Sequence, residues 1–165
     1  MIISIIGGVL IVLLTALFAF TPNSASPSTI PLLKSYALQL INKQRLEFHL
    51  HPLLEGTAIS ADKQAKFLLS QLTLTHLDYS GNGPSTRYLE NAETGYVAEN
   101  LSVYRCGDFY ACETAIGNAI EDMMNDSVSR KNILNLDLTH VSTGIAVGGG
   151  KISMVFDFEA KGHNK

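Results

Sequence analysis

Two runs of alternating residues near the end of the chain constrain its fold more than any other feature of the sequence. In a β-strand every second side chain lies on the same face, so alternating apolar residues indicate a half-buried strand. The alternating positions are Val141, Thr143, Ile145, Val147, Ile152, Met154, Phe156 and Phe158. Because glycines at 148–150 separate the two runs, the segment predicts a two-stranded hairpin with one buried face. A further strand is expected near Val97–Tyr104.

Three earlier segments carry apolar residues at helical spacing. The first helix is expected to begin at a cap formed by Ser28 or Thr29 and to end near Glu47. The second runs from about Thr57 to Leu72, and the third from about Glu113 to Asp126. The second helix would bury Ala58, Ala61, Ala65, Leu68, Leu69 and Leu72. Helices that precede strands in this way predict an α+β layer structure.

A polar stretch from Thr75 to Tyr96 separates the second helix from the expected strand. Its SGNGPS sequence is typical of turns, so the stretch predicts a surface loop. Long loops in a compact domain are frequently functional, and we therefore expect this loop to form the rim of a site.

The first segment, Met1–Phe20, is apolar and contains no charged side chain. Its length is close to the roughly 20 residues that cross a bilayer as a helix. A cleavable signal peptide normally has a basic start and small residues before the cut, and both are poorly represented here. We therefore favour an uncleaved membrane anchor over a signal peptide or a buried core helix, with the rest of the chain outside the cytoplasm.

The remaining chain divides into a linker, one domain and a short tail. Residues 21–31 are rich in Ser, Thr and Pro, as extended linkers are. A chain of 165 residues leaves room for one domain, expected at residues 32–160, followed by a tail at 161–165. The formal net charge of −3 and the scattered Lys and Arg residues give no basic stripe, so nucleic acid is not an expected partner.

The sequence has 2 cysteines, Cys106 and Cys112, within the segment YRCGDFYAC. In an exported domain a close pair of this kind predicts a disulfide. In a cytosolic domain the same pair would remain as free thiols. A structural zinc site needs more ligands than this pair supplies.

Several short motifs resemble those of the CAP superfamily, which includes cysteine-rich secretory proteins, venom allergens and plant pathogenesis-related proteins. The resemblance covers about Leu38–Phe158 and is greatest to the prokaryotic branch, the SCP-domain proteins. The motifs are LINKQR (40–45), THLDYSGNGPSTR (75–87), GYVAEN (95–100), RKNILN (130–135), LTHVSTG (138–144) and VFDFE (155–159). A single match would be weak evidence, but the whole set in the right order is specific.

This resemblance implies a three-layer α-β-α sandwich with a central, mainly antiparallel sheet. It also implies a cleft that holds two histidines and two acidic residues. His76 and Glu99 match the first of each kind, and Asp126 matches the second acidic position. Ser129 stands where the second histidine of the family belongs, which is the most important departure. The tryptophan usual in the third helix is also missing. In the LTHVSTG motif, Ser142 stands where the family has a glycine.

The family cleft would bring His76 close to Glu99, and the helical wheel places Asp126 in line with Ala119 and Met123. A contact between His76 and Glu99 would orient the imidazole and favour its charged form. The same contact would equally serve as a structural tie, because polar groups in a partly buried cleft must satisfy one another.

Some family members bind a divalent cation through the two histidines, and His76 is the best candidate for a metal ligand in this chain. A catalytic zinc site has three protein ligands and a water. The hydroxyl of Ser129 is a poor substitute for imidazole, although His140 lies near enough in sequence to contribute. Zinc is therefore the one cofactor to consider, and we expect the site to be incomplete.

Ser129, His76 and Glu99 are also the residue types of a Ser-His-acid set, but nothing around Ser129 indicates an oxyanion hole or a nucleophile turn. We therefore expect no catalytic residues, and we expect Arg87 and Arg130 to pin loops. The expected function is a secreted or membrane-anchored binding or interaction module rather than an enzyme, and the resemblance implies a lipid or an envelope component as its class of ligand. The alternative is an extracellular metal-dependent hydrolase that acts on peptide or envelope polymer.

Overall fold

The computed structural model describes residues 29–160 of the chain. The predicted anchor at residues 1–20, most of the predicted linker at 21–31 and the predicted tail at 161–165 lie outside these residues. Between residues 29 and 160, none of the helices combines the length and the apolar character that a membrane span requires.

The domain is built around a 4-stranded sheet whose strands lie in the order β1-β3-β4-β2. The three long strands pair antiparallel, and only the short β1 pairs parallel, with β3. The strands are β1 (Leu54–Glu55), β2 (Tyr96–Arg105), β3 (His140–Gly148) and β4 (Lys151–Ala160). The predicted hairpin and the predicted strand near Val97–Tyr104 are therefore present, whereas β1 gave no signal because it is only 2 residues long.

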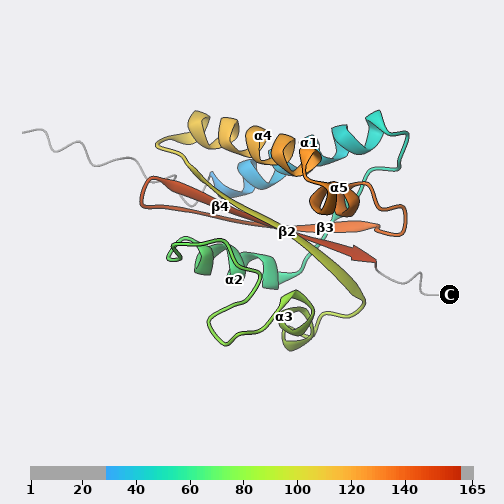
Figure 1. Ribbon diagram of the computed structural model, residues 1–165. Coiled ribbons are helices and arrows are strands. Elements are labelled where there is room, and N and C mark those ends of the chain that lie inside the picture. Colours follow the sequence, from blue (N-terminus) through green and yellow to red (C-terminus); the bar gives the residue numbers. More distant parts are fainter. Residues whose placement is uncertain (1–28, 161–165) are drawn as a thin grey trace, which may run out of the picture.

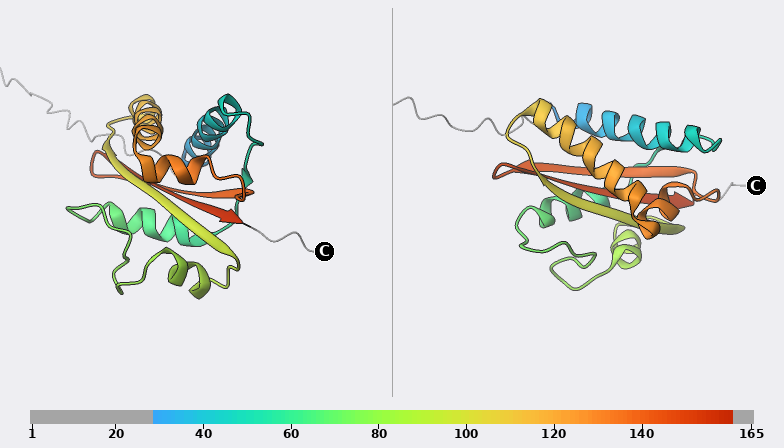
Figure 2. Two further views of the ribbon diagram at one scale, coloured as in Figure 1. Left: turned by 45° about the vertical axis from the view of Figure 1, so that its right-hand side comes forward. Right: turned by 45° about the horizontal axis from the view of Figure 1, so that its top comes forward.

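Helices cover both faces of this sheet, as Figures 1 and 2 show. One outer layer consists of α1 (Ile30–Glu47), α4 (Phe109–Asn125) and α5 (Ser127–Ile133). The other consists of α2 (Ile59–Leu68) and α3 (Pro84–Glu90). The arrangement confirms the predicted α+β fold and its three-layer α-β-α form.

The layer of α1, α4 and α5 packs on the sheet through large apolar side chains. Register pairing places alternate residues of the strands on this face, among them Phe156 and Phe158 of β4. The core on this face includes Leu33, Ala37, Ile41, Ile116, Ala119, Ile133, Val141, Ile145, Met154, Phe156 and Phe158. Deleting one such phenylalanine typically costs about 3–5 kcal/mol, so this layer supplies much of the domain's stability.

The opposite face of the sheet is also buried, which corrects the prediction of a hairpin with one buried face. Every residue of β4 from Ile152 to Glu159 is buried, because α2 covers the side that the alternation suggested was open. The approach of α2 is close: a Cβ added at Gly144 would overlap the backbone oxygen of Ala61. Ala61 and Ala65 then pack on Val155. Small residues on α2 and β3 therefore let this helix lie against the sheet.

The predicted second helix is too long at its end. It ends at Leu68, and the amides of Ser70 and Gln71 bond to Phe67 O and Leu68 O in tight turns. Leu72, which the helical wheel placed in the core, is fully exposed. The sequence offers no glycine or proline to mark this end.

Three helical features were missed or misplaced by the pattern of apolar residues. The helix α3 lies inside the predicted loop, where Pro84 occupies one of the first helical positions. The helix α4 begins at Phe109, earlier than predicted, because the Asp108 side chain accepts a hydrogen bond from the Ala111 amide. The short α5 was not predicted at all.

A disulfide joins Cys106, just after β2, to Cys112 in α4, which confirms the predicted bridge. No free cysteine occurs among the described residues, so the free-thiol alternative is wrong. The bridge ties the end of the edge strand β2 to the first part of the helix that packs over it. Both cysteines are buried.

Candidate functional site

The site is built on Glu99, a buried carboxylate in the middle of β2. Its side chain is only 1% exposed. One carboxylate oxygen, Oε1, lies 2.7 Å from Nδ1 of His76, which follows α2 in the chain. The other oxygen, Oε2, accepts a hydrogen bond from the guanidinium of Arg87 in α3. Three segments that are separate in sequence therefore meet at one carboxylate, and the predicted contact between His76 and Glu99 is present.

Arg87 holds both the carboxylate and the loop that carries His76. Its Nη2 donates to Glu99, while its Nη1 donates to the backbone oxygens of His76 and Asn82. The expectation that Arg87 pins a loop therefore agrees with the structure. Its second role, as the buried partner of Glu99, was missed because the helix α3 that positions it was taken for loop.

His76 is the accessible member of this group. Its side chain is 56% exposed, whereas Glu99 and Arg87 are buried. The hydrogen bond with Glu99 raises the pKa of His76 above its usual value, against the opposing effects of burial and of the Arg87 charge. Glu99 thus fixes Nδ1 and favours a charged ring, and among the described residues Nε2 has no hydrogen-bond partner.

A second buried acid, Asp157, lies beside Glu99 on the next strand. The two residues are register partners on β2 and β4, so their side chains lie on the same face of the sheet. Asp157 Oδ2 accepts a hydrogen bond from Ser60 Oγ at 2.8 Å. Burial, followed by the nearby charge of Glu99, raises the pKa of Asp157 to about 7. The signal in the sequence was an acid at an alternate position of an apolar strand, and it was not used.

A third acid of the same face, Glu159, is bound to hydroxyl groups. Tyr88 donates its hydroxyl to Glu159 Oε2 at 2.8 Å, and the Ser142 hydroxyl donates to Glu159 Oε1. Ser142 Oγ also accepts a hydrogen bond from the Ala58 amide at 2.7 Å. The serine that departs from the family's glycine therefore completes a buried polar chain between β3, β4 and the start of α2.

Asp126 and Ser129 lie together, but they do not contact His76 or Glu99. Asp126 separates α4 from α5, and its Oδ1 accepts a hydrogen bond from the Ser129 amide at 2.8 Å. This capping bond holds the pKa of Asp126 below its usual value. Asp126 is exposed, so its predicted alignment with Ala119 and Met123 is wrong, because the helix ends at Asn125.

Ser129 is held from the sheet through its backbone. Its carbonyl oxygen accepts a hydrogen bond from Asn100 Nδ2 at 3.0 Å. Asn100 follows Glu99 in β2, so its side chain lies on the opposite face of the sheet. Asn132 Nδ2 in turn donates to Asn100 Oδ1 at 2.8 Å. The residue in the position of the second family histidine thus belongs to the junction with α5.

His140 begins β3 and lies apart from His76. Its Nδ1 is 2.8 Å from the hydroxyl of Thr139, and it lines a groove of about 770 Å³ together with His49, His51 and Leu136. His76 and Glu99 do not line this groove. The structure therefore does not bring His140 to the position that a third zinc ligand would need.

The donor set does not fit a zinc ion. Both Glu99 oxygens are engaged by His76 and Arg87, and Ser129 and His140 belong to other contacts. In the part of the chain that the structure describes, no group of 3 or more His, Cys, Asp or Glu residues is placed to hold a metal ion. The site provides one accessible imidazole, oriented by Glu99, that can exchange hydrogen bonds or protons.

No family model matches the sequence, and no curated protein matches it either. Solved structures do match. An extracellular SCP-domain protein from Bacillus anthracis is 20% identical, with a TM-score of 0.61 over 82% of this chain. An outer surface protein from Borrelia burgdorferi is 16% identical, with a TM-score of 0.67 over 81% of this chain and 96% of its own length.

The CAP domain of Enterococcal PrgA is 18% identical, with a TM-score of 0.56 over 82% of this chain. The matching region spans only 44% of the Bacillus protein and 63% of the PrgA chain. These similarities show that the chain has the fold of CAP and SCP domains, as its motifs predicted.

Proposed function

We propose that this chain, which has the CAP/SCP fold, is an extracytoplasmic member of the prokaryotic branch of the CAP superfamily and acts as a binding module. Three features support the extracytoplasmic location: the disulfide, the apolar first segment, and the extracellular or outer-surface descriptions of the structural neighbours. The first segment would hold the module at the membrane or direct its export.

The observation that carries this proposal is the full engagement of the Glu99 carboxylate. One oxygen is bound to His76 and the other to Arg87, and the side chain is only 1% exposed, so the carboxylate itself does not face a substrate or a metal ion. Removing one partner of such a buried pair typically costs about 3–5 kcal/mol. Glu99 therefore orients the His76 ring, and this arrangement supports ligand binding by His76.

The ligand-binding group is the exposed ring of His76. With Nδ1 fixed on Glu99, the ring in its charged form, which this contact favours, presents Nε2–H as a directed donor toward solvent-accessible space. Such a donor suits a phosphate or carboxylate oxygen. Both groups occur in envelope lipids and in envelope polymers, so the proposed ligand is an anionic envelope component.

A metal-dependent hydrolase receives no support from a specific contact. It would require a third ligand near His76, whereas Ser129 and His140 are committed to other parts of the domain. We therefore keep the binding module as the one proposed function.

The test is co-sedimentation of the full chain with purified peptidoglycan and, separately, with vesicles that contain phosphatidylglycerol, the latter measured relative to vesicles of phosphatidylcholine alone because the apolar first segment would itself bind any bilayer. We expect saturable binding to one of these, reduced at least about fivefold by His76→Ala, which corresponds to about 1 kcal/mol. The matched control is His51→Ala, because His51 is also an exposed histidine but lies in another part of the domain. Equal binding by both variants would contradict the role of His76, and peptidoglycan hydrolysis that His76→Ala abolishes would contradict a non-catalytic module.

A further inference from the structure

A small pocket lies between α2, α3 and the loop that connects them. Its volume is about 230 Å³. The residues that decide its chemistry are Gln64, Phe67, Asp78, Tyr79, Arg87 and Glu90. Neither His76 nor Glu99 lines it, so it is separate from the proposed His76 site although Arg87 reaches both.

Two buried polar groups of this pocket lack a partner among the described residues. Gln64 is 1% exposed, and its amide nitrogen donates to Thr75 O and Leu77 O, but its Oε1 accepts no hydrogen bond. Arg87 is 4% exposed, and its Nη atoms are engaged, but its Nε donates no hydrogen bond. An unsatisfied buried polar group typically costs about 1–3 kcal/mol, so a ligand that satisfies both groups has a direct source of affinity.

The charges of the pocket favour a neutral ligand. Lys63 and Arg87 are balanced by Asp78 and Glu90 among the lining residues. Most of these charges are already engaged: Lys63 donates to Asn91, Arg87 to Glu99, and Glu90 accepts both bonds from Asn82. Because two positive and two negative side chains line the same small pocket, a charged ligand would be attracted by one pair and repelled by the other.

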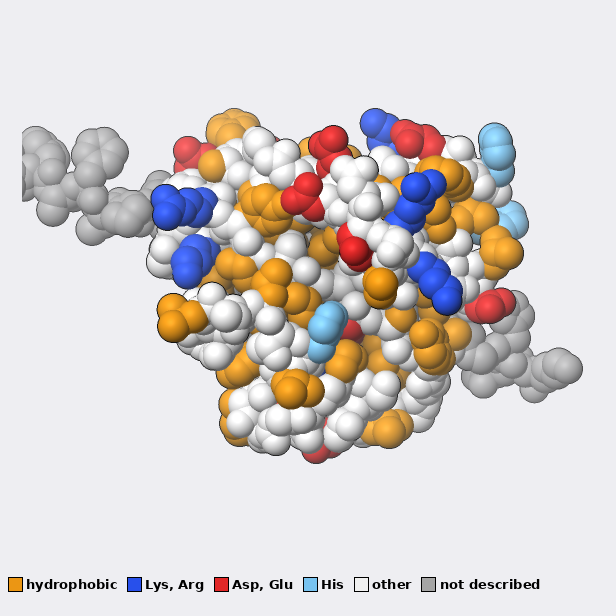
Figure 3. Space-filling view, in the orientation of Figure 1, with side chains coloured by type: hydrophobic (Ala, Val, Ile, Leu, Met, Phe, Trp, Pro, Cys, Tyr) orange, Lys and Arg blue, Asp and Glu red, His pale blue; other side chains and the backbone are white. Residues whose placement is uncertain are grey.

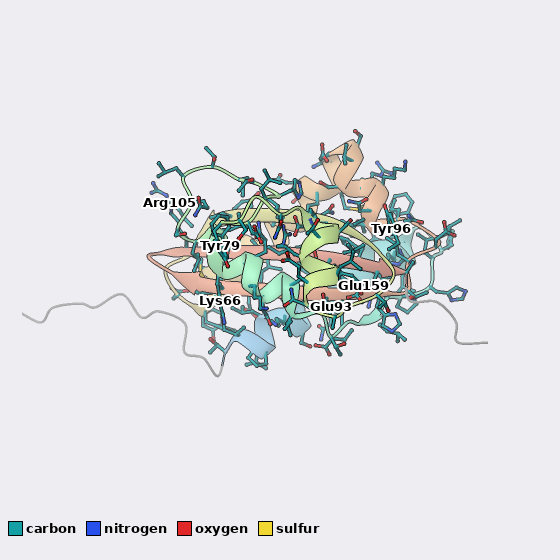
Figure 4. All side chains as sticks on the ribbon, turned by 90° about the horizontal axis from the view of Figure 1, so that it is seen from below. Lys66, Tyr79, Glu93, Tyr96, Arg105 and Glu159 are labelled. Carbon is teal, nitrogen blue, oxygen red and sulfur yellow. A yellow bond between two sulfur atoms is a disulfide. The ribbon has the colours of Figure 1, made fainter. Side chains whose placement is uncertain are left out.

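An aromatic residue at the pocket offers an apolar face. Tyr79 is 87% exposed, and Phe67 lines the same pocket from α2. Figure 4 shows Tyr79 beside one end of α2, while Glu93 and Glu159 lie together beside the other end. Exposed tyrosines next to polar pockets combine a flat apolar surface with hydrogen-bonding groups, which suits ligands that have both kinds of surface.

We propose that this pocket binds one neutral, hydroxyl-rich sugar ring. Hydroxyl groups both donate and accept, so the hydroxyls of a sugar can donate to Gln64 Oε1 and accept from Arg87 Nε–H, the two unpartnered groups of the lining residues. The C–H face of the ring would pack on Tyr79. A volume of about 230 Å³ lies below the roughly 300–1,000 Å³ of pockets for drug-sized ligands, which suits a single ring. The proposal names a second site and ligand, so it can fail without the His76 proposal failing.

The direct test follows the Arg87 Nε–H signal by NMR in the full chain, kept in a detergent without a sugar head group. We titrate glucose and N-acetylglucosamine to about 50 mM, because one ring is expected to bind with a dissociation constant of the order of 1 mM. A saturable shift of this signal by either sugar is expected. A signal that does not move with either sugar would overturn the proposal.

Variants then assign the binding to this pocket. Tyr79→Ala should weaken binding at least about fivefold, while Tyr79→Phe, which keeps the ring, should stay within about twofold. Tyr110→Ala is the matched control, because Tyr110 is an exposed tyrosine on α4 in the opposite layer. Unchanged binding by Tyr79→Ala would contradict the proposal. Gln64→Met should also lose binding, and Tyr79→Ala decides the question if Gln64→Met fails to fold.

Further titrations distinguish the source and the chemistry of the ligand. A linear trisaccharide of the sugar that binds should match or exceed the single ring if the natural ligand is a glycan end, and should bind more weakly if it is a free sugar. Acetate and methylammonium are expected to leave the Arg87 signal unchanged. A stronger response to either ion than to the sugars would overturn the assignment to a neutral ring.

Discussion

The two faces of the sheet are built from the same strands but in different ways. Toward α1 and α4, β4 presents Met154, Phe156 and Phe158, and the contacts are almost entirely apolar. Toward α2 and α3, the intervening residues of the same strand include Asp157 and Glu159, each buried in a hydrogen-bonded group. One strand thus carries the stabilising core on one face and the polar site on the other.

This division shows how a small domain positions a functional group without weakening its core. The apolar face holds the strands in register, so the polar face can keep buried carboxylates next to one another. The outer surface gives little sign of this arrangement, since Figure 3 shows charged side chains in small groups among apolar and uncharged surface. The difference between the faces predicts different responses to substitution and to pH.

The largest effect is expected on the apolar face. Phe158→Ala should lower the free energy of unfolding by about 3–5 kcal/mol, because it removes a fully buried ring from the main core. The loss should be nearly the same between pH 5 and pH 8, since no charge is involved. Urea denaturation measures it, with Leu72→Ala as a control that should stay within about 0.5 kcal/mol. If the loss of unfolding free energy in Phe158→Ala depends strongly on pH, the two faces do not differ in the way proposed.

A loss of similar size is expected when the central pair of the polar face is broken. Glu99→Leu leaves the buried guanidinium of Arg87 without its carboxylate, and should cost about 3–5 kcal/mol. The double variant Glu99→Leu with Arg87→Met removes both charges, so it should cost clearly less than the sum of the single losses. A double-mutant cycle by urea denaturation measures the coupling. Additive losses of unfolding free energy would show that Glu99 and Arg87 are not energetically coupled.

A smaller effect, with the opposite sign, is expected at Asp157. Its folded-state pKa is raised to about 7, above the usual unfolded value of about 3.9. The folded protein therefore binds the proton more tightly, and this group lowers stability as the pH rises from about 4 to about 7. Asp157→Asn should be more stable than the wild type at pH 8, by about 1–3 kcal/mol, and should lose that advantage near pH 4.

Urea denaturation at several pH values measures the effect of Asp157→Asn. Asp137→Asn is the matched control, because it is the same substitution at an exposed aspartate. If the two variants have parallel profiles, the buried carboxylates of the polar face do not control its pH dependence.

The smallest effect is expected at His76. Its folded-state pKa is raised by the bond to Glu99, so its contribution to stability is present below the unfolded pKa, which is usually about 6.5. That contribution is lost as the pH rises through the folded-state pKa. Because the side chain is more than half exposed, His76→Gln should cost less than about 1 kcal/mol at pH 5.5 and almost nothing at pH 9.

Thermal unfolding at the two pH values measures this difference, with His51→Gln as the exposed control. A loss that grows with pH would show that the neutral ring, and not the charged one, is bound to Glu99. A binding role for His76 predicts that the same substitution reduces ligand binding much more than stability.

Much of the fold followed from patterns of residues close together in the sequence. Helical spacing placed α1 and most of α2 and α4, alternation placed β3 and β4, and the strand expected near Val97–Tyr104 corresponds to β2. The short elements α3, α5 and β1 were missed, because a segment of a few residues has too few apolar positions to show a period. The motifs predicted the three-layer arrangement, which the solved neighbours share.

The site was only partly predictable. The contact of His76 with Glu99 was expected from the motifs, and the structure contains it. The grouping of Asp126, Ser129 and His140 around the same cleft was not found: Asp126 and His140 make contacts with residues close in sequence, and the Ser129 carbonyl is bound by Asn100. Arg87 and Asp157 were missed as partners of Glu99, since both reach it only through tertiary packing.

The sequence by itself determined the long helices and strands, the disulfide, and the kind of fold, because these depend on periodicity, cysteine spacing and ordered motifs. The tertiary structure alone decided which face of each strand is polar inside the domain and which groups satisfy Glu99. The physical reason is that alternation assigns side chains to two faces but does not say what covers each face. Here α2 and α3 bury the second face, so its carboxylates must find partners from distant segments.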